Sequence, residues 1–281
     1  HRDLHSFPTR RSSDLWIGFE QTLNMAETLP PPWIPIQTEE RTLTTLTQKY
    51  EFGENGLPTQ IIVTGQSLLA APVLLTMPGF RLTRPMAFTR RSDVSCEWES
   101  AFESDSLVAT LKGTAEFDGM LRYDLSLRPK NQNARLTTLQ LTVPVAKENG
   151  QYFLPYAGPY QKWNMLDIPT DASRPYSDAF MPHLWVGGNT CGVAWFSESD
   201  EFYFPVDEAK VVRVIPDEES TSMFIDMVGQ SLQIAEPICY TFGLQATPAK
   251  PLPENWGSYH LAGCDSTLHR PILSMGYTTG P

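Results

Sequence analysis

The chain has 281 residues and a formal net charge of −11 at pH 7, and 41% of its residues are hydrophobic. Nucleic acids and anionic membranes both repel an acidic surface, so neither is expected as a partner. No apolar run approaches the ~20 residues of a membrane-spanning helix. A chain of this length can bury a core large enough to fold without disulfides.

The two ends differ from the middle in composition. Residues 1–15, HRDLHSFPTRRSSDL, correspond to the translation of a common sequencing-adapter oligonucleotide, so we expect this stretch to be non-native. Residues 16–32 are expected to form the tail of an upstream segment and a proline-rich connector. Residues 33–247 are then the folded domain, and residues 248–281 are a proline-marked linker. We expect the chain to be a fragment of a longer, metagenomic sequence.

From residue 41 the sequence becomes a series of short β-prone runs separated by turn residues. Residues 107–117 and 120–127 flank Asp118-Gly119, a residue pair that favours a tight hairpin turn. Apolar and polar residues alternate in the second run, as they do in a sheet with one buried and one wet face. About a dozen such strands, without long 3.6-residue periodicity, predict an all-β fold, an antiparallel β-sandwich.

A second hairpin is predicted within residues 181–200. Apolar runs at 183–186 and 191–196 flank Gly187-Gly188-Asn189-Thr190, where glycine and asparagine accept positive φ. Trp185 and Trp195 lie on opposite sides of this turn and are candidates for cross-strand neighbours.

Side chains that bind metals are scarce. Cys96, Cys191, Cys239 and Cys264 are far apart and form no Cys-x-x-Cys pair, so we expect no metal site and no cofactor. Buried free thiols are favoured, with a disulfide as the open alternative. His183 is expected to be a structural histidine.

Glu198 and Asp200 follow the second hairpin. On an extended strand, residues two apart share a face at about 6–7 Å, a separation that could suit glycosidic cleavage. A surface strand end that contacts a neighbouring domain is the favoured interpretation. No catalytic residue is therefore assigned.

An aromatic segment provides the other candidate contacts. Flat aromatic rings pack against the apolar faces of pyranoses, and residues 151–165 contain Tyr156, Tyr160 and Trp163. The alternative is that these rings close one end of the sandwich. With Trp185, Trp195, Glu198 and Asp200, they form the set of candidate carbohydrate or inter-domain contacts.

Several segments together resemble a known family. Besides the 181–200 hairpin, these are PPWIPIQ (31–37), YEFGENGLPTQI (50–61), LLAAPV (68–73), FDGMLRYDLSL (117–127) and TPAKPLPENW (247–256). In order and spacing they resemble the N-terminal β-sandwich that precedes the catalytic barrel of proteins related to glycoside hydrolase family 123. The resemblance covers residues 30–256.

The resemblance implies a function for the parent protein. Enzymes of family 123 are retaining N-acetyl-β-galactosaminidases in which an adjacent Asp–Glu pair of the (β/α)8 barrel works with the substrate's acetamido group. No position here matches that pair. The implied partner is the protein's own C-terminal catalytic barrel, reached through residues 248–281, and the implied location is secreted or periplasmic.

Two hypotheses follow. The first is a non-catalytic N-terminal domain of a truncated glycoside hydrolase that supports the barrel and shapes the glycan cleft. The second is a free-standing carbohydrate-binding or surface interaction module. The linker-like stretch from residue 248 favours the first.

Overall fold

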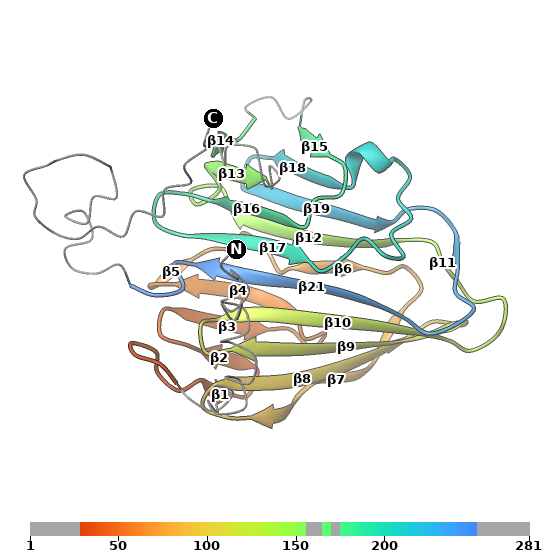
Figure 1. Cartoon of the computed structure of the whole chain (residues 1–281), viewed down its shortest axis with the longest axis horizontal. Coiled ribbons are helices and arrows are strands. Elements are labelled where there is room, and N and C mark those ends of the chain that lie inside the picture. Colours follow the sequence, from red (N-terminus) through yellow and green to blue (C-terminus); the bar gives the residue numbers. More distant parts are fainter. Residues whose placement is uncertain (1–28, 156–164, 170–174, 252–281) are drawn as a thin grey trace, which may run out of the picture. The chain divides into compact units, whose positions relative to one another are not determined.

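The computed structural model describes residues 29–155, 165–169 and 175–251 of the chain (Figure 1). The chain divides into two units, residues 1–250 and residues 251–281, and the fold described below belongs to the first. The described part contains 21 strands and one short 3-10 helix, η3 (Glu208–Lys210). The predicted all-β class is confirmed, with more strands than the dozen expected.

The largest sheet has nine strands in the order β14-β13-β16-β17-β21-β10-β9-β8-β7. Their bounds are β7 (Arg81–Arg91), β8 (Ser95–Glu103), β9 (Leu107–Glu116), β10 (Met120–Pro129), β13 (Tyr152–Pro155), β14 (Leu166–Asp167), β16 (His183–Gly187), β17 (Gly192–Ser197) and β21 (Ile238–Thr247). Neighbouring strands pair antiparallel throughout.

Three smaller sheets complete the fold. One contains β1 (Gln37–Glu39), β2 (Thr42–Thr44), β3 (Gln48–Phe52), β4 (Pro58–Val63) and β5 (Gln66–Ser67), in that order. A second has the order β15-β18-β19-β12-β6, with β6 (Leu74–Thr76), β12 (Leu139–Ala146), β15 (Tyr176–Asp178), β18 (Val212–Pro216) and β19 (Ser220–Val228). The third pairs β11 (Arg135–Leu136) with β20 (Leu232–Gln233).

One hydrophobic core joins the nine-stranded sheet to the two five-stranded sheets. The rings of Phe52 on β3 and Trp98 on β8 are 4.7 Å apart, and Tyr50 Oη donates to the carbonyl of Gly119 at 2.7 Å. Leu141 on β12 is fully buried in the same core. The nine-stranded sheet therefore has an inner face in the core and an outer face on the surface.

Both predicted hairpins are present. β9 and β10 flank Asp118-Gly119, where Gly119 has a φ of +83° and Asp118 Oδ1 accepts from the amide of Met120 at 3.0 Å. β16 and β17 flank the second turn, which is closed by a 2.8 Å bond from the amide of Gly188 to the carbonyl of Cys191. In both cases local turn chemistry was sufficient for the prediction.

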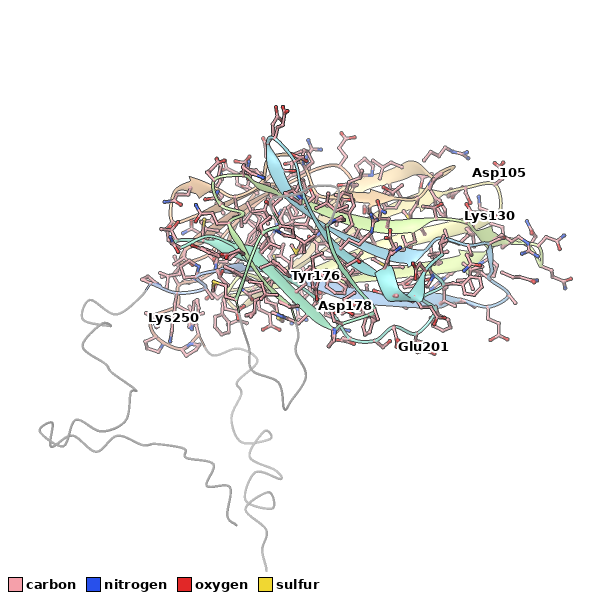
Figure 2. The ribbon with its side chains drawn as sticks, turned by 90° about the horizontal axis from the view of Figure 1, so that it is seen from above. Asp105, Lys130, Tyr176, Asp178, Glu201 and Lys250 are labelled. Atoms are coloured by element: carbon pink, nitrogen blue, oxygen red, sulfur yellow. The ribbon has the colours of Figure 1, made fainter. Side chains whose placement is uncertain are left out.

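The end of β21 is tied to the turn before β3. The Gln48 side chain is buried, and its Nε2 donates to the carbonyls of Ala246 and Pro248 at 3.2 and 3.1 Å. Thr47 Oγ1 donates to the carbonyl of Pro248 at 2.9 Å. The same Oγ1 lies 2.9 Å from the carbonyl of Ala249, so the backbone is held as far as the residue before Lys250, which is labelled in Figure 2.

Candidate functional site

The Trp185 ring lies against the outer face of the nine-stranded sheet. A Cβ on Gly187 would stand 2.2 Å from Cζ2 of the indole, and a Cβ on Gly192 would stand 2.4 Å from the same atom. Gly187 and Gly192 are cross-strand partners, so the ring covers the space of two absent side chains. The indole Nε1 donates to Thr247 Oγ1 on β21 at 3.0 Å, which fixes the orientation of the ring.

Phe196 makes a similar contact one strand away. A Cβ on Gly243 of β21 would stand 2.1 Å from Cζ of the Phe196 ring. Phe196 pairs with Gly243 on one side and with His183 on the other. Burial lowers the pKa of the partly buried His183, which favours its neutral form at pH 7. We call Trp185 and Phe196 the aromatic platform.

Trp195 does not belong to this platform. It pairs with Leu184, whereas Trp185 pairs with Ala194, so the two tryptophans point to opposite faces of the sheet. The prediction that Trp185 and Trp195 are cross-strand neighbours is wrong. The register pairs each tryptophan with a residue adjacent to the other, and a shift of one residue places a side chain on the opposite face of the strand. Trp195 is fully buried, so it has no surface for a glycan or another domain.

Glu198 is the first residue after β17 and belongs to an exposed charge cluster. Arg122 Nη1 lies 2.8 Å from Glu198 Oε1, and Arg122 Nη2 lies 3.3 Å from Asp124 Oδ1. The hydrogen bond that Arg122 donates to Asp124 raises the pKa of the guanidinium. Thr241 Oγ1 also donates to Asp124, at 2.7 Å. Glu198 is therefore part of a surface ion-pair network.

Asp200 lies in the segment that connects β17 to η3. β17 ends at Ser197, and Glu198 and Asp200 are both exposed, as expected for a strand end. The Asp200 carbonyl accepts from the amide of Tyr203 at 2.9 Å. Since the extended strand has already ended, the two-residue spacing of Glu198 and Asp200 no longer defines a shared face.

The same segment exposes three apolar side chains at alternate positions. Phe202, Phe204 and Val206 are 38%, 42% and 75% exposed, and we call them the exposed stripe. The intervening residues point inward, because Pro205 is buried and the Tyr203 ring lies 6.0 Å from that of Tyr240. No motif in the sequence marked this stripe.

Hydrogen bonds hold the backbone of the exposed stripe in place. The Phe204 amide donates to the carbonyl of Met227 at 2.7 Å, and the Gly229 amide donates to the carbonyl of Phe204 at 2.9 Å. Tyr240 Oη donates to the carbonyl of Phe202 at 3.0 Å. The apolar side chains are thus displayed from a fixed backbone.

Two hollows of 370 Å³ each lie beside the exposed stripe, and Pro205 lines both. Asp200, Glu208, Tyr203 and Phe180 contribute to one of them. The other contains Arg213 and Asp226, whose side chains form a two-pronged ion pair with N–O distances of 2.7 and 2.9 Å. Asp226 also accepts from the Gln140 amide. Arg213 is therefore already neutralised.

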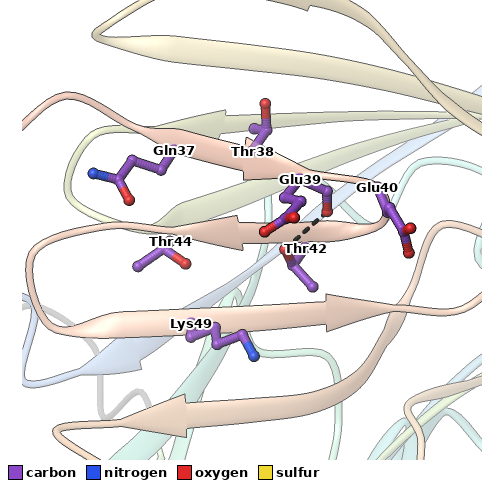
Figure 3. A pocket seen from close by; sticks show the side chains of 7 residues that line it. All are labelled: Gln37, Thr38, Glu39, Glu40, Thr42, Thr44 and Lys49. Carbon is purple, nitrogen blue, oxygen red and sulfur yellow. Dashed lines mark hydrogen bonds between the residues drawn. The ribbon is translucent and has the colours of Figure 1, made fainter.

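A hollow of 640 Å³ on the first five-stranded sheet is lined by Gln37, Thr38, Glu39, Glu40, Thr42, Thr44 and Lys49 (Figure 3). All come from β1, β2, β3 or the turn after β1. Thr42 Oγ1 donates to the carbonyl of Glu39 at 2.8 Å, and Lys49 Nζ pairs with Glu51 at 2.8 Å. Because the hairpin of β1 and β2 and the adjacent strand β3 form the whole lining, the hollow is an open polar surface.

Cys96, Cys191 and Cys239 are free thiols, and the first two are buried. Cys239 is exposed, so the expectation of burial is wrong for this thiol. Cys264 lies outside the described residues. Within the described ranges, no three His, Cys, Asp or Glu side chains are placed to hold a metal ion. No helix in this part of the chain has the length and apolar character to cross a membrane.

Tyr156, Tyr160 and Trp163, the predicted stacking residues of the aromatic segment, also lie outside the described residues. Of the predicted contacts, the structure thus places Trp185 on the aromatic platform. Glu198 lies in the charge cluster and Asp200 beside the exposed stripe. Phe196 was not identified from the sequence, because its position opposite Gly243 depends on the pairing of β17 with β21.

Residues 36–207 match the family described as glycoside hydrolase 123, third domain. The match is to a third domain, and it does not place the chain at the amino terminus of its parent as the sequence motifs suggested. The third-domain description also implies that proteins of this family have further domains. No curated protein matches the chain.

Three solved structures show distant likeness. The Slr1438 protein from Synechocystis sp. PCC 6803 is 9% identical over 78% of this chain and 96% of that chain, with a TM-score of 0.44. An alpha-mannosidase from Enterococcus faecalis V583 is 10% identical over 76% of this chain and 30% of its own, with a TM-score of 0.48. Galactose 1-epimerase from Lactobacillus acidophilus NCFM is 7% identical over 78% and 99%, with a TM-score of 0.42.

Proposed function

Because this chain belongs to the family of glycoside hydrolase 123 third domains, we propose that it is a non-catalytic β-sandwich that supports a catalytic barrel and helps to shape its glycan cleft. The proposed parent is an N-acetyl-β-galactosaminidase-like protein. The observation that carries the support role is the exposed stripe of Phe202, Phe204 and Val206, which offers a surface for the barrel of the same polypeptide.

The alternation of side chains around the stripe supports this role. Surface strands of antiparallel sheets ordinarily bury apolar residues and expose polar ones. From Phe202 to Val206 both sides of the segment are apolar, since Tyr203 and Pro205 face inward. Single exposed apolar residues need no explanation, but a contiguous group indicates a contact surface.

The backbone at Phe202 adds a second argument. Its φ of +67° is uncommon for an aromatic residue and costs roughly 1–3 kcal/mol. The hydrogen bond from Tyr240 to the Phe202 carbonyl stabilises this turn. The fold thus maintains a costly conformation that exposes an aromatic ring, which is understandable if a partner covers that ring.

The charges around the stripe indicate which kind of partner surface would be complementary. Glu201, Asp207 and Glu208 are exposed beside it, and Glu201 lies at the outside of the ribbon in Figure 2. Hydrogen bonds from the Ala209 amide and from Lys210 lower the pKa of Asp207, so it stays ionised at neutral pH. The surface of the barrel that fits here would be apolar with basic residues at its rim.

The test is a titration of the chain with a separately produced catalytic barrel of a glycoside hydrolase 123 protein. Replacing Phe204 and Val206 together by serine should weaken binding at least ~10-fold, because apolar surface at the centre of an interface dominates its energy. Leu74, which is 54% exposed on β6, provides the matched control Leu74→Ser, with unchanged affinity expected. Equal binding by both variants would contradict the support role.

The non-catalytic assignment has its own test. The purified chain should release no sugar from β-N-acetylgalactosaminides, since Glu198 is paired with Arg122 and Asp200 lies in another environment. Turnover that survives purification and disappears in Glu198→Gln or Asp200→Asn would show that this domain is itself catalytic.

A free-standing carbohydrate-binding module is the second candidate. The aromatic platform favours it, because such a module would use exposed rings without a barrel. Glycan binding in the absence of any binding to the barrel would support this alternative.

A further inference from the structure

The orientation of Trp185 limits what its side chain can contact. One face of the indole covers the buried backbone of Gly187 and Gly192, and its Nε1 is already bonded to Thr247. Trp185 itself remains partly exposed. The part of the ring that can meet a ligand is therefore the side turned away from the two glycines. A flat π face suits a ligand with a flat apolar side.

The rows of paired residues that contain the platform carry no formal charge. Three successive rows across β13, β16, β17 and β21 consist of Tyr152, Gly187, Gly192 and Thr247; Leu154, Trp185, Ala194 and Gln245; and His183, Phe196 and Gly243. Charged residues flank these rows on both sides, because Asp167 on β14 pairs with Tyr152 and Arg122 on β10 pairs with Gly243. In a chain with a net charge of −11, this neutral patch favours an uncharged ligand over an ionic one.

Polar groups at the edge of the patch complement the rings. Gln245 pairs with Ala194, beside Trp185, and its Nε2 donates to the carbonyl of Asp118 at 3.2 Å. Within the described part of the chain, Gln245 Oε1 has no donor and can accept from a hydroxyl. Rings with hydrogen-bonding groups at their rim recognise molecules that have both C–H faces and hydroxyl edges.

We propose that the aromatic platform is a stacking subsite for one uncharged pyranose ring, with Trp185 as the principal contact. Phe196 extends the apolar surface, and Gln245 accepts a hydrogen bond from a ring hydroxyl. The inference rests on the proposed function for the class of ligand, and it assigns the glycan contact to this face of the nine-stranded sheet. The exposed stripe is not part of the subsite.

The experiment is saturation-transfer NMR with the full chain and methyl β-D-galactopyranoside, followed by titration to obtain Kd. A single stacked ring should bind with a Kd of roughly 1–10 mM, and the C–H protons of the sugar's apolar face should receive the strongest transfer. Galactitol, which keeps the hydroxyls of the pyranoside and adds those at C1 and C5 but has no ring, should show no transfer. Absence of transfer to the pyranoside would overturn the proposal.

The variants separate ligand binding from folding. Trp185→Leu should weaken the pyranoside at least ~10-fold, because stacking is lost, and Trp185→Phe should weaken it less. Trp33 is also partly exposed but packs edge-on against Phe117 at 5.4 Å, so Trp33→Leu is the matched control and should bind normally. Undiminished binding by Trp185→Leu would exclude the platform as the site.

Gly192→Ala supplies an independent check, because it keeps the indole but displaces it from the sheet. A Cβ at this position would stand 2.4 Å from Cζ2 and 2.7 Å from Nε1 of Trp185, so the ring must tilt. Pyranoside binding should fall at least ~3-fold while circular dichroism remains that of the parent chain. If the ring only covers glycines to stabilise the sheet, the parent chain will not bind the pyranoside at all.

The outcome is distinguishable from that of the barrel titration. Serine at positions 204 and 206 should leave pyranoside binding unchanged, since the stripe lies outside the platform. Barrel binding without pyranoside binding would refute the stacking subsite alone. Pyranoside binding without barrel binding would leave the subsite intact and refute the support role.

Discussion

Trp98 and Trp185 make the same contact on opposite faces of one sheet. The Trp98 ring lies over Gly113, where a Cβ would stand 2.0 Å from Cε2, and its Nε1 donates to the carbonyl of Gly56 at 2.9 Å. Trp185 likewise lies over a glycine of the neighbouring strand and donates its Nε1 across the sheet. Trp98 is fully buried, whereas Trp185 is partly exposed.

The difference lies in what covers the outer side of each ring. The Phe52 and Tyr123 rings pack on Trp98 with centroid distances of 4.7 and 5.8 Å, so its whole surface is used in the core. Trp185 has the glycine contact, and no ring of the residues that the structure describes packs on its outer side. A tryptophan laid on glycine is therefore a core element on one face and a candidate ligand contact on the other.

Truncating each tryptophan tests this comparison most directly. Trp98→Ala should lower the free energy of unfolding by about 3–5 kcal/mol, because it opens a large cavity in a packed core. Trp185→Ala should cost about 1 kcal/mol or less, since the ring borders solvent. Urea denaturation with unchanged m-values measures both. Equal losses would mean that Trp185 is as structural as Trp98.

Alanine at the facing glycines sharpens the comparison. Gly113→Ala should lower the free energy of unfolding by roughly 1–3 kcal/mol, because the buried indole cannot move away from the new methyl group. Gly192→Ala should cost less, about 1 kcal/mol, because the Trp185 ring can tilt into solvent. The same urea titrations apply, and a larger loss for Gly192→Ala would contradict the assignment of an open outer face.

A pH titration of stability tests the inner face through Cys96 on β8. Burial raises the pKa of the Cys96 thiol from 9.0 to about 12. Above pH ~9 the unfolded chain loses this proton while the folded chain keeps it, so stability declines as pH rises toward 12, by up to ~1.4 kcal/mol per unit. Below pH 9 the contribution is fully present.

The Cys96→Ala variant should flatten this decline, and the exposed Cys239 provides the control Cys239→Ala, which should leave it unchanged. Chemical denaturation at intervals between pH 8 and pH 11 measures the slope. An identical slope in Cys96→Ala and the parent chain would show that the thiol is not held protonated by the core.

The sequence by itself determined the features that depend on neighbouring residues. Alternation along β10 and the Asp118-Gly119 turn predicted its hairpin with β9, and the glycine-rich turn predicted the hairpin of β16 and β17. Both signals depend on a few neighbouring residues, so they do not require knowledge of how the rest of the chain folds. Together they were sufficient for the all-β class, although not for the number of strands.

Only the tertiary structure decided which residues share a face across strands distant in sequence. The register of β16 with β17 sent Trp185 outward and Trp195 inward, and the pairing of β17 with β21 brought Phe196 onto Gly243. The exposed stripe likewise depends on hydrogen bonds with Met227, Gly229 and Tyr240. A shift of one residue in any such pairing exchanges the faces of a strand, and no local pattern specifies that shift.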